Sequence, residues 1–395
     1  MRALIRAALA DTSEGSMRTL IEELSGPGDS SKARKSFLSV LARDFDLDRR
    51  LVIEKSATLS NLESHDSWRE AVSDLREALV PARVRLLKRF GESPEGLKLL
   101  VDLREELLKL GRDDSVMRQL EHELRPMIAT WFDVGILELK RLTWNSPAAV
   151  LEKLVRYESV HEIRGWRDLK KRLDPDRRCF AFFHSCMPGE PLTFVEVALV
   201  QGLATHIASL LDEKAPRNDP KKADTAIFYS ISNCRKGLAG INLAHFLIKR
   251  AVDELKRELP SLNTFATLSP VPGFAAWLKS YFAEASTNGA DPLTRRERAA
   301  IASLPRPLTS RSLIELMALP EWYENQSLSL ALRQPLMRLC AHYLIDTRNA
   351  DGGAADPVAH FHLSNGARIE RINWMADLSP KGISQSYGLM VNYRY

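Results

Sequence analysis

The 395-residue sequence lacks any apolar segment approaching the roughly 20 residues that span a bilayer, so we expect no membrane helix. The chain also lacks a large excess of charge of either sign. The chain has 56 Lys and Arg against 51 Asp and Glu, a net charge of only +5 that is spread along the chain. Such diffuse charge argues against nucleic acid as a partner, although a mildly basic surface suits an anionic ligand.

Cysteine is rare, and its spacing fits no structural zinc site. We therefore expect no metal, free thiols and a cytoplasmic location, because a reducing compartment keeps such thiols unpaired. The first ten residues are too short and too interrupted by arginine to act as a secretory signal. The cysteines are Cys179, Cys186, Cys234 and Cys340.

The length suggests two domains, of which the first, residues 1–130, shows helical spacing throughout. Phe37 and Leu41 recur at that spacing. Pro81 predicts a break in a helical run, and Ser93 followed by Pro94 predicts the start of the next helix. We find no strand pattern and no cluster of reactive groups here. This region is predicted to be an all-α helical bundle for packing or assembly.

From about residue 131 the pattern changes to short runs rich in β-branched and aromatic residues, separated by helical segments. Alternation of this kind favours a mixed α/β sheet. The predicted fold class is therefore α+β, with a helical bundle followed by a mixed α/β domain at residues 131–395. The predicted strands cover residues 179–183, 194–200, 226–231 and 264–268.

A glycine loop follows the third of these runs and precedes a helix-like run over residues 241–259. The order strand, glycine loop, helix presents backbone N–H groups to a phosphate at the positive end of a helix. Gly237 and Gly240 can both adopt positive φ and let a pyrophosphate approach the main chain. A simple strand–helix turn is the alternative interpretation.

The spacing of this loop excludes a P-loop and a dinucleotide fingerprint. It partly matches Arg/Gln-x-x-Gly-x-Gly/Ala, and so resembles the pyrophosphate loop that binds CoA in the GNAT N-acetyltransferase fold. Gly237 and Ala239 fit that pattern, whereas Cys234 occupies its first position.

Two further motifs carry candidate chemistry. Ser269 follows a predicted strand in a stiff turn with two prolines, where it is either a positioned hydroxyl or a turn cap. His360 and His362 form a His-x-His pattern that we expect on one side of a strand. A metal site is the weaker possibility because no third ligand is apparent. We expect one of the two histidines to act on a substrate.

Several ordered segments stand out between about Trp131 and the last residue: 178–184 (RCFAFFH), 187–192 (MPGEPL), 226–232 (AIFYSIS), 268–274 (LSPVPGF), 361–363 (FHL), 371–377 (RINWMAD) and 392–395 (NYRY). Together they resemble the malonyl-CoA decarboxylase family. The resemblance implies a helical oligomerisation domain at 1–130, a GNAT-like catalytic domain at 131–395, and a homotetramer built as a dimer of dimers.

The resemblance also implies site residues. Ser269 and His362 match the catalytic serine and histidine, and Tyr395 matches the active-site tyrosine. Asn242 stands where animal members carry a glutamate, so a carboxylate is not required there or another group replaces it. The residues implied in binding the CoA substrate are Arg235, Gly237, Ala239, Gly240, Ile241, Asn242, Leu243, Ala244, His245, Ser269 and His362.

The implied reaction converts malonyl-CoA to acetyl-CoA and CO2 without metal, biotin or another cofactor. We expect Ser269 to orient the malonyl group, His362 to protonate the enolate, and Tyr395 and Asn242 to orient groups or stabilise the oxyanion. One alternative is a GNAT-type CoA-dependent acyltransferase, which would need an acceptor groove and a base. Another is a non-catalytic acyl-CoA sensor.

Overall fold

The computed structural model describes residues 1–10, 14–26, 30–61, 65–305 and 312–395. Contacts divide these residues into two compact units. Unit 1 contains Met1–Lys140, Ala181–Phe194 and Asn233–Phe246, and unit 2 contains Arg141–Phe180, Val195–Ser232 and Leu247–Tyr395. Two later segments therefore join the helical region in unit 1, and the expected boundary at residue 130 stays a prediction.

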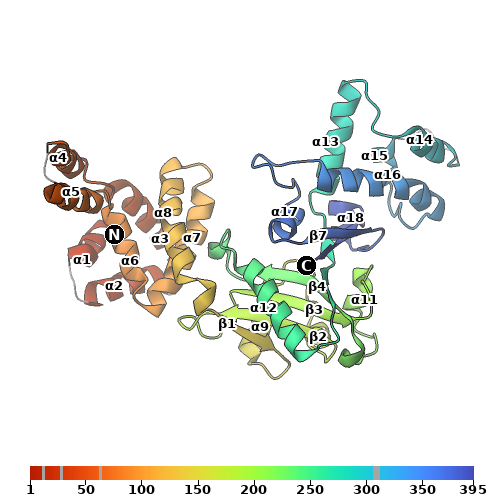
Figure 1. Ribbon diagram of the computed structural model, residues 1–395, viewed down its shortest axis with the longest axis horizontal. Helices are drawn as coiled ribbons and strands as arrows, with labels where there is room; N and C mark the ends of the chain where they lie inside the picture. The colour runs from red at the N-terminus through yellow and green to blue at the C-terminus, as the bar shows by residue number, and fades with distance from the viewer. Residues whose placement is uncertain (11–13, 27–29, 62–64, 306–311) are drawn as a thin grey trace. The chain divides into compact units, whose positions relative to one another are not determined.

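The first segment of unit 1 is helical, as predicted (Figure 1). Ser93 caps the seventh helix by accepting from the Gly96 backbone N–H, and Pro94 is its first residue. Pro81 lies between the fifth and sixth helices, where a break was predicted. The helices are α1 (Arg2–Ala10), α2 (Glu14–Ser25), α3 (Ser30–Asp44), α4 (Arg49–Ser60), α5 (His65–Ala78), α6 (Ala82–Phe90), α7 (Pro94–Leu110) and α8 (Ser115–Trp131).

A mixed eight-stranded sheet follows, in the order β1-β2-β3-β4-β5-β8-β6, with β7 paired to β8. Strand β4 runs parallel to β5, and β8 runs antiparallel to β5, β6 and β7. This confirms the predicted mixed α/β sheet. The strands are β1 (Glu138–Leu142), β2 (Arg177–Phe183), β3 (Thr193–Val200), β4 (Thr225–Asn233), β5 (Thr264–Thr267), β6 (Ser269–Pro270), β7 (Arg368–Asn373) and β8 (Met390–Arg394).

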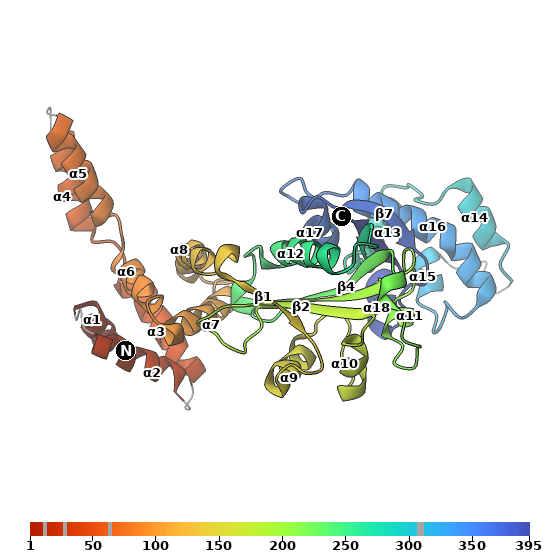
Figure 2. The same cartoon turned by 60° about the horizontal axis from the view of Figure 1, so that its bottom comes forward.

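Helices cover both faces of the sheet. Figure 2 shows α9 and α10 on one face and α12 and α17 on the other. Most of the other helices of this half pack around a core in which Phe274, Leu336 and Tyr393 are buried together, whereas α11 buries Ile207 and Leu210 in a second cluster. The helices are α9 (Ala148–Tyr157), α10 (Trp166–Arg172), α11 (Ile207–Leu211), α12 (Leu243–Glu258), α13 (Phe274–Thr287), α14 (Arg295–Ala302), α15 (Leu313–Met317), α16 (Gln326–Ile345), α17 (Pro357–Ser364) and α18 (Pro380–Ser386).

Two local predictions are wrong. His360 and His362 lie on helix α17, not on a strand, because Asp356 caps the helix by accepting from the Val358 and Ala359 N–H groups. Of the two loop glycines, only Gly240 has a positive φ, at 74°.

In the part of the chain that the structure describes, short 3₁₀ helices lie at Val134–Ile136, Pro220–Lys222 and Lys236–Leu238. None of the helices in the described ranges is both long and apolar enough to cross a membrane. All four cysteines are free thiols, as expected.

Candidate active site

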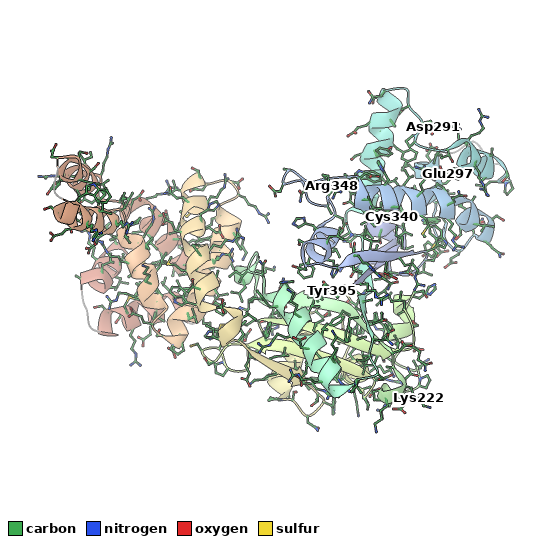
Figure 3. The ribbon with its side chains drawn as sticks, in the orientation of Figure 1. Lys222, Asp291, Glu297, Cys340, Arg348 and Tyr395 are labelled. Atoms are coloured by element: carbon green, nitrogen blue, oxygen red, sulfur yellow. The ribbon has the colours of Figure 1, made fainter. Side chains whose placement is uncertain are left out.

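Ser269, His362 and Tyr395 meet in unit 2, although they come from three separate parts of the chain. The Ser269 hydroxyl lies 3.0 Å from Nε2 of His362, and the Tyr395 hydroxyl lies 2.8 Å from Nδ1 of the same ring. Ser269 pairs with Val391 across β6 and β8, while the Tyr395 backbone N–H donates to Phe265 on β5. Figure 3 labels Tyr395 at the end of the chain, just beyond β8. The sheet therefore aligns two of the three residues and α17 supplies the third.

The hydrogen bonds around Ser269 indicate which nitrogen of His362 carries a proton. The Ser269 hydroxyl donates to Oγ1 of Thr267 at 2.8 Å, and this oxygen also accepts from the Tyr393 backbone N–H. Because a hydroxyl has one proton, Ser269 then accepts from Nε2–H of His362. Nδ1 of the ring is left to accept from the Tyr395 hydroxyl. The four groups form a chain of donors that runs from Tyr395 to Thr267.

His362 is held as a neutral imidazole. Its exposed fraction is 2%, and its ring stacks on Tyr393 with centroids 4.5 Å apart. Burial lowers the pKa of His362 to about 3, because a charged imidazolium is poorly solvated there. Burial also raises the pKa of the Tyr395 hydroxyl above its ordinary range. At neutral pH the cluster is therefore uncharged and protonated at every hydroxyl.

Asp356 connects the segment that carries Ser269 with the helix that carries His362. This role was not predicted from the sequence. Its carboxylate is fully buried; besides capping α17 it accepts from the Gly273 N–H at 3.1 Å. Ser269 lies on strand β6 and not in the predicted turn, and Gly273 follows it by four residues, so one side chain connects the segment after β6 with the helix of His362. The signal was the pair Asp356-Pro357, an N-cap followed by proline at the first helical position.

The glycine loop lies in unit 1, where it packs against α7 and α8. The Gly237 carbonyl accepts from the Arg104 guanidinium at 2.6 Å, and the Gly240 carbonyl accepts from Arg125 at 3.0 Å. A Cβ at Gly237 would collide with the Val101 carbonyl oxygen. Gly237 is therefore required for close backbone approach rather than for positive φ.

Arg235 is engaged by carboxylates within the same unit. Its guanidinium forms ion pairs with Asp102 on α7 and with Glu190. A phosphate would have to compete with both carboxylates for this side chain. Arg235 thus ties the loop to α7, and its predicted contact with CoA stays a prediction.

The other predicted loop residues lie where the loop runs into α12. Asn242 is exposed and directly precedes the helix. The loop residues through Phe246 belong to unit 1, whereas Ser269, His362 and Tyr395 belong to unit 2. The structure brings the latter three together, and the CoA roles of the former stay predictions. The residues in question are Ala239, Gly240, Ile241 and Asn242 of the loop and Leu243, Ala244 and His245 of the first turn of α12.

Within the described ranges, no group of three or more His, Cys, Asp or Glu residues is arranged to hold a metal ion. The helical placement of the His-x-His motif separates its members, since His362 is buried and His360 is exposed.

A buried neutral histidine, hydrogen-bonded to a serine on one side and to a tyrosine on the other, is a site of the kind that enzymes use for proton transfer. Sequence models give the particular family. Residues 135–395 match the malonyl-CoA decarboxylase C-terminal domain, and residues 45–132 match the malonyl-CoA decarboxylase N-terminal domain. The chain belongs to the malonyl-CoA decarboxylase family, as the resemblance predicted.

Individual relatives agree. The mitochondrial malonyl-CoA decarboxylase of Anser anser anser is 41% identical over 376 residues, covering 92% of this chain and 74% of the relative. The crystal structure of malonyl-CoA decarboxylase from Rhodopseudomonas palustris has a TM-score of 0.85 at 38% identity, covering 100% of this chain and 92% of that one. The Agrobacterium vitis enzyme has a TM-score of 0.87 at 38% identity, with 99% and 91% covered.

Proposed function

We propose that this chain is a malonyl-CoA decarboxylase, a carboxy-lyase that converts malonyl-CoA to acetyl-CoA and CO2. The observation that carries the proposal is the neutral His362, bonded to Ser269 on one side and Tyr395 on the other, in a chain of this family. The neutral hydroxyl and imidazole groups of this cluster can donate hydrogen bonds. Such fixed donors suit a reaction in which negative charge moves from a carboxylate to a thioester oxygen.

In the first step, the bond between the malonyl carboxylate and the α-carbon breaks. Its electron pair forms an enolate whose charge lies on the thioester oxygen. Ser269 orients the malonyl group so that the breaking bond overlaps the carbonyl. A preorganised donor at a developing oxyanion typically contributes about 3–4 kcal/mol. The proposed mechanism relies on such donors and uses no metal, biotin or other cofactor.

In the second step, the enolate carbon takes the proton of Nε2 of His362, directly or through water. The neutral ring has one proton to give, so Nδ1 must gain another from the Tyr395 hydroxyl, with which it is already hydrogen-bonded. The Nδ1 proton then returns to the oxygen of Tyr395, which is partly exposed, and Nε2 takes a proton from water, so the resting tautomer is restored. The net reaction consumes malonyl-CoA and one proton and yields acetyl-CoA and CO2.

Incubation of the purified chain with malonyl-CoA and no acceptor tests this function. We expect stoichiometric acetyl-CoA and CO2, unaffected by prior dialysis against EDTA or by avidin. An acyltransferase would instead show turnover only when an amine acceptor is added. Tight CoA binding without turnover would indicate a sensor.

Assembly and location belong to the same proposal. A homotetramer, as a dimer of dimers, is supported by the family resemblance of the helical region and is tested by light scattering of the purified chain. A cytoplasmic location is supported by the four free thiols. The relative from Anser anser anser is mitochondrial by name, so cell fractionation is the deciding measurement.

A further inference from the structure

Two arginines of the helical bundle are buried to the same degree but make different contacts. Arg83 and Arg104 each have an exposed fraction of 2%. Each forms an ion pair with a glutamate of α8, Arg83 with Glu123 and Arg104 with Glu121. Each also donates to one backbone carbonyl. For Arg83 this carbonyl is Ala42 within the bundle, whereas for Arg104 it is Gly237 in the glycine loop.

The contact from Arg104 restrains the loop at its closest approach to α7. The guanidinium is held on Glu121 by two of its nitrogens, Nε at 3.0 Å and one Nη at 2.8 Å, and the other Nη reaches the Gly237 carbonyl at 2.6 Å. The Val101 carbonyl blocks the loop from moving closer, because even a Cβ at Gly237 would collide with it. The arginine blocks it from moving away.

These contacts also change the electrostatics of the loop. A backbone carbonyl directed at a pyrophosphate would repel it, since both groups carry negative charge on oxygen. Arg104 and Arg125 donate to the carbonyls of Gly237 and Gly240. Both oxygens therefore point toward the helices, and the positive guanidinium groups offset their partial negative charge. A planar guanidinium can serve a carboxylate and a carbonyl at once, which the point charge of a lysine cannot do equally well.

We propose that Arg104 is a positioning residue for the CoA-binding loop, so that the helical region contributes to substrate affinity as well as to assembly. This inference rests on the proposed function, in which the loop around Gly237 binds the CoA moiety. Arg104 does not touch the ligand in this scheme. It fixes the conformation of the loop to which the pyrophosphate of CoA binds.

The test compares Arg104→Met with Arg83→Met in the full-length chain. Acetyl-CoA binding is measured by titration calorimetry, and thermal unfolding is measured on the same samples. Both variants lose a buried ion pair and should unfold at a lower temperature. Only Arg104→Met should weaken acetyl-CoA binding, by about tenfold, since a hydrogen bond from a charged donor is lost at the loop. Its KM for malonyl-CoA should rise by more than its kcat falls.

Arg104→Lys is the third variant. It keeps a cation beside Glu121, so it should fold and bind acetyl-CoA with intermediate affinity. If Arg104→Met does not fold, the acetyl-CoA affinity of Arg104→Lys alone tests the inference. Parental affinity in Arg104→Met, or in Arg104→Lys where that variant decides, overturns the inference. So does an equal loss of affinity in Arg83→Met, because the effect would then be general destabilisation. If the parental chain does not bind acetyl-CoA, the proposed function itself fails.

Discussion

The glycine loop and the Ser269 cluster are both stabilised by hydrogen bonds, but the first uses charged groups and the second neutral ones. Arg104, Arg125 and Arg235 hold the loop, whereas the cluster is a chain of hydroxyls around the imidazole of His362. A polyanionic ligand is best met by a backbone whose carbonyls are already neutralised. Proton transfer is best served by donors without net charge. Under the proposed function, the difference means that substrate binding and proton transfer place opposite electrostatic demands on one chain.

The largest effect is expected on kcat, from substitutions in the neutral cluster, and it tests whether the cluster serves chemistry and the loop serves binding. His362→Ala and Ser269→Ala should each lower kcat by roughly 10²–10⁴-fold, the range of general acid–base catalysis. Acetyl-CoA binding should persist, because the charged loop is untouched. Steady-state kinetics and calorimetry measure the two quantities separately.

His360 provides the matched control, since it lies on the same helix but is exposed. His360→Ala should alter kcat only mildly. Parental turnover in either His362→Ala or Ser269→Ala would remove that residue from the proposed mechanism.

The next largest effect is on the free energy of unfolding. The contribution of the His362 cluster should depend on pH, whereas that of the arginines around the glycine loop should not. Burial lowers the pKa of His362 to about 3 from its ordinary value of 6.5. Between these values the unfolded chain binds a proton that the folded chain does not, so stability is full above pH 6.5 and falls as the pH is lowered. The loss from His362 alone is on the order of 2 kcal/mol by pH 5. Arginine keeps its charge throughout this range.

Urea unfolding of the parental chain and of His362→Gln at pH 7 and pH 5 measures this effect. The variant should lose less stability on acidification than the parental chain does. His161, whose pKa burial lowers to about 4, should continue to contribute in both proteins. An identical pH dependence in the two proteins would mean that His362 is not buried in its neutral form.

The smallest effect concerns the order of protons within the cluster. Thr267→Val removes the oxygen that accepts from Ser269, so the Ser269 proton can turn to Nε2 of His362 and reverse the donor chain. We expect kcat to fall by up to about tenfold, the value of one neutral hydrogen bond. The ¹⁵N resonances of the His362 ring should report the other tautomer, and Thr267→Ser should restore both properties. A fall in kcat with an unchanged tautomer would contradict the proposed proton order.

Much of the architecture could be predicted from local sequence. Ser93-Pro94 and Pro81 marked helix boundaries correctly, because capping and proline geometry act over a few residues. The β-branched runs marked β2, β3, β4 and β5 for the same local reason, whereas β1, β6, β7 and β8 were not predicted. The helix that carries His362 was mistaken for a strand, since a two-residue alternation was given more weight than the N-cap signal of Asp356-Pro357.

The sequence by itself determined the family, through its ordered motifs, and it supplied Ser269, His362 and Tyr395 as candidate reactive groups. Only the tertiary structure decided that Ser269, His362 and Tyr395 form one hydrogen-bonded chain and that the histidine is neutral. Separations of 93 and 33 residues lie far beyond the reach of local patterns. The lowered pKa of His362 depends on surroundings that only packing creates.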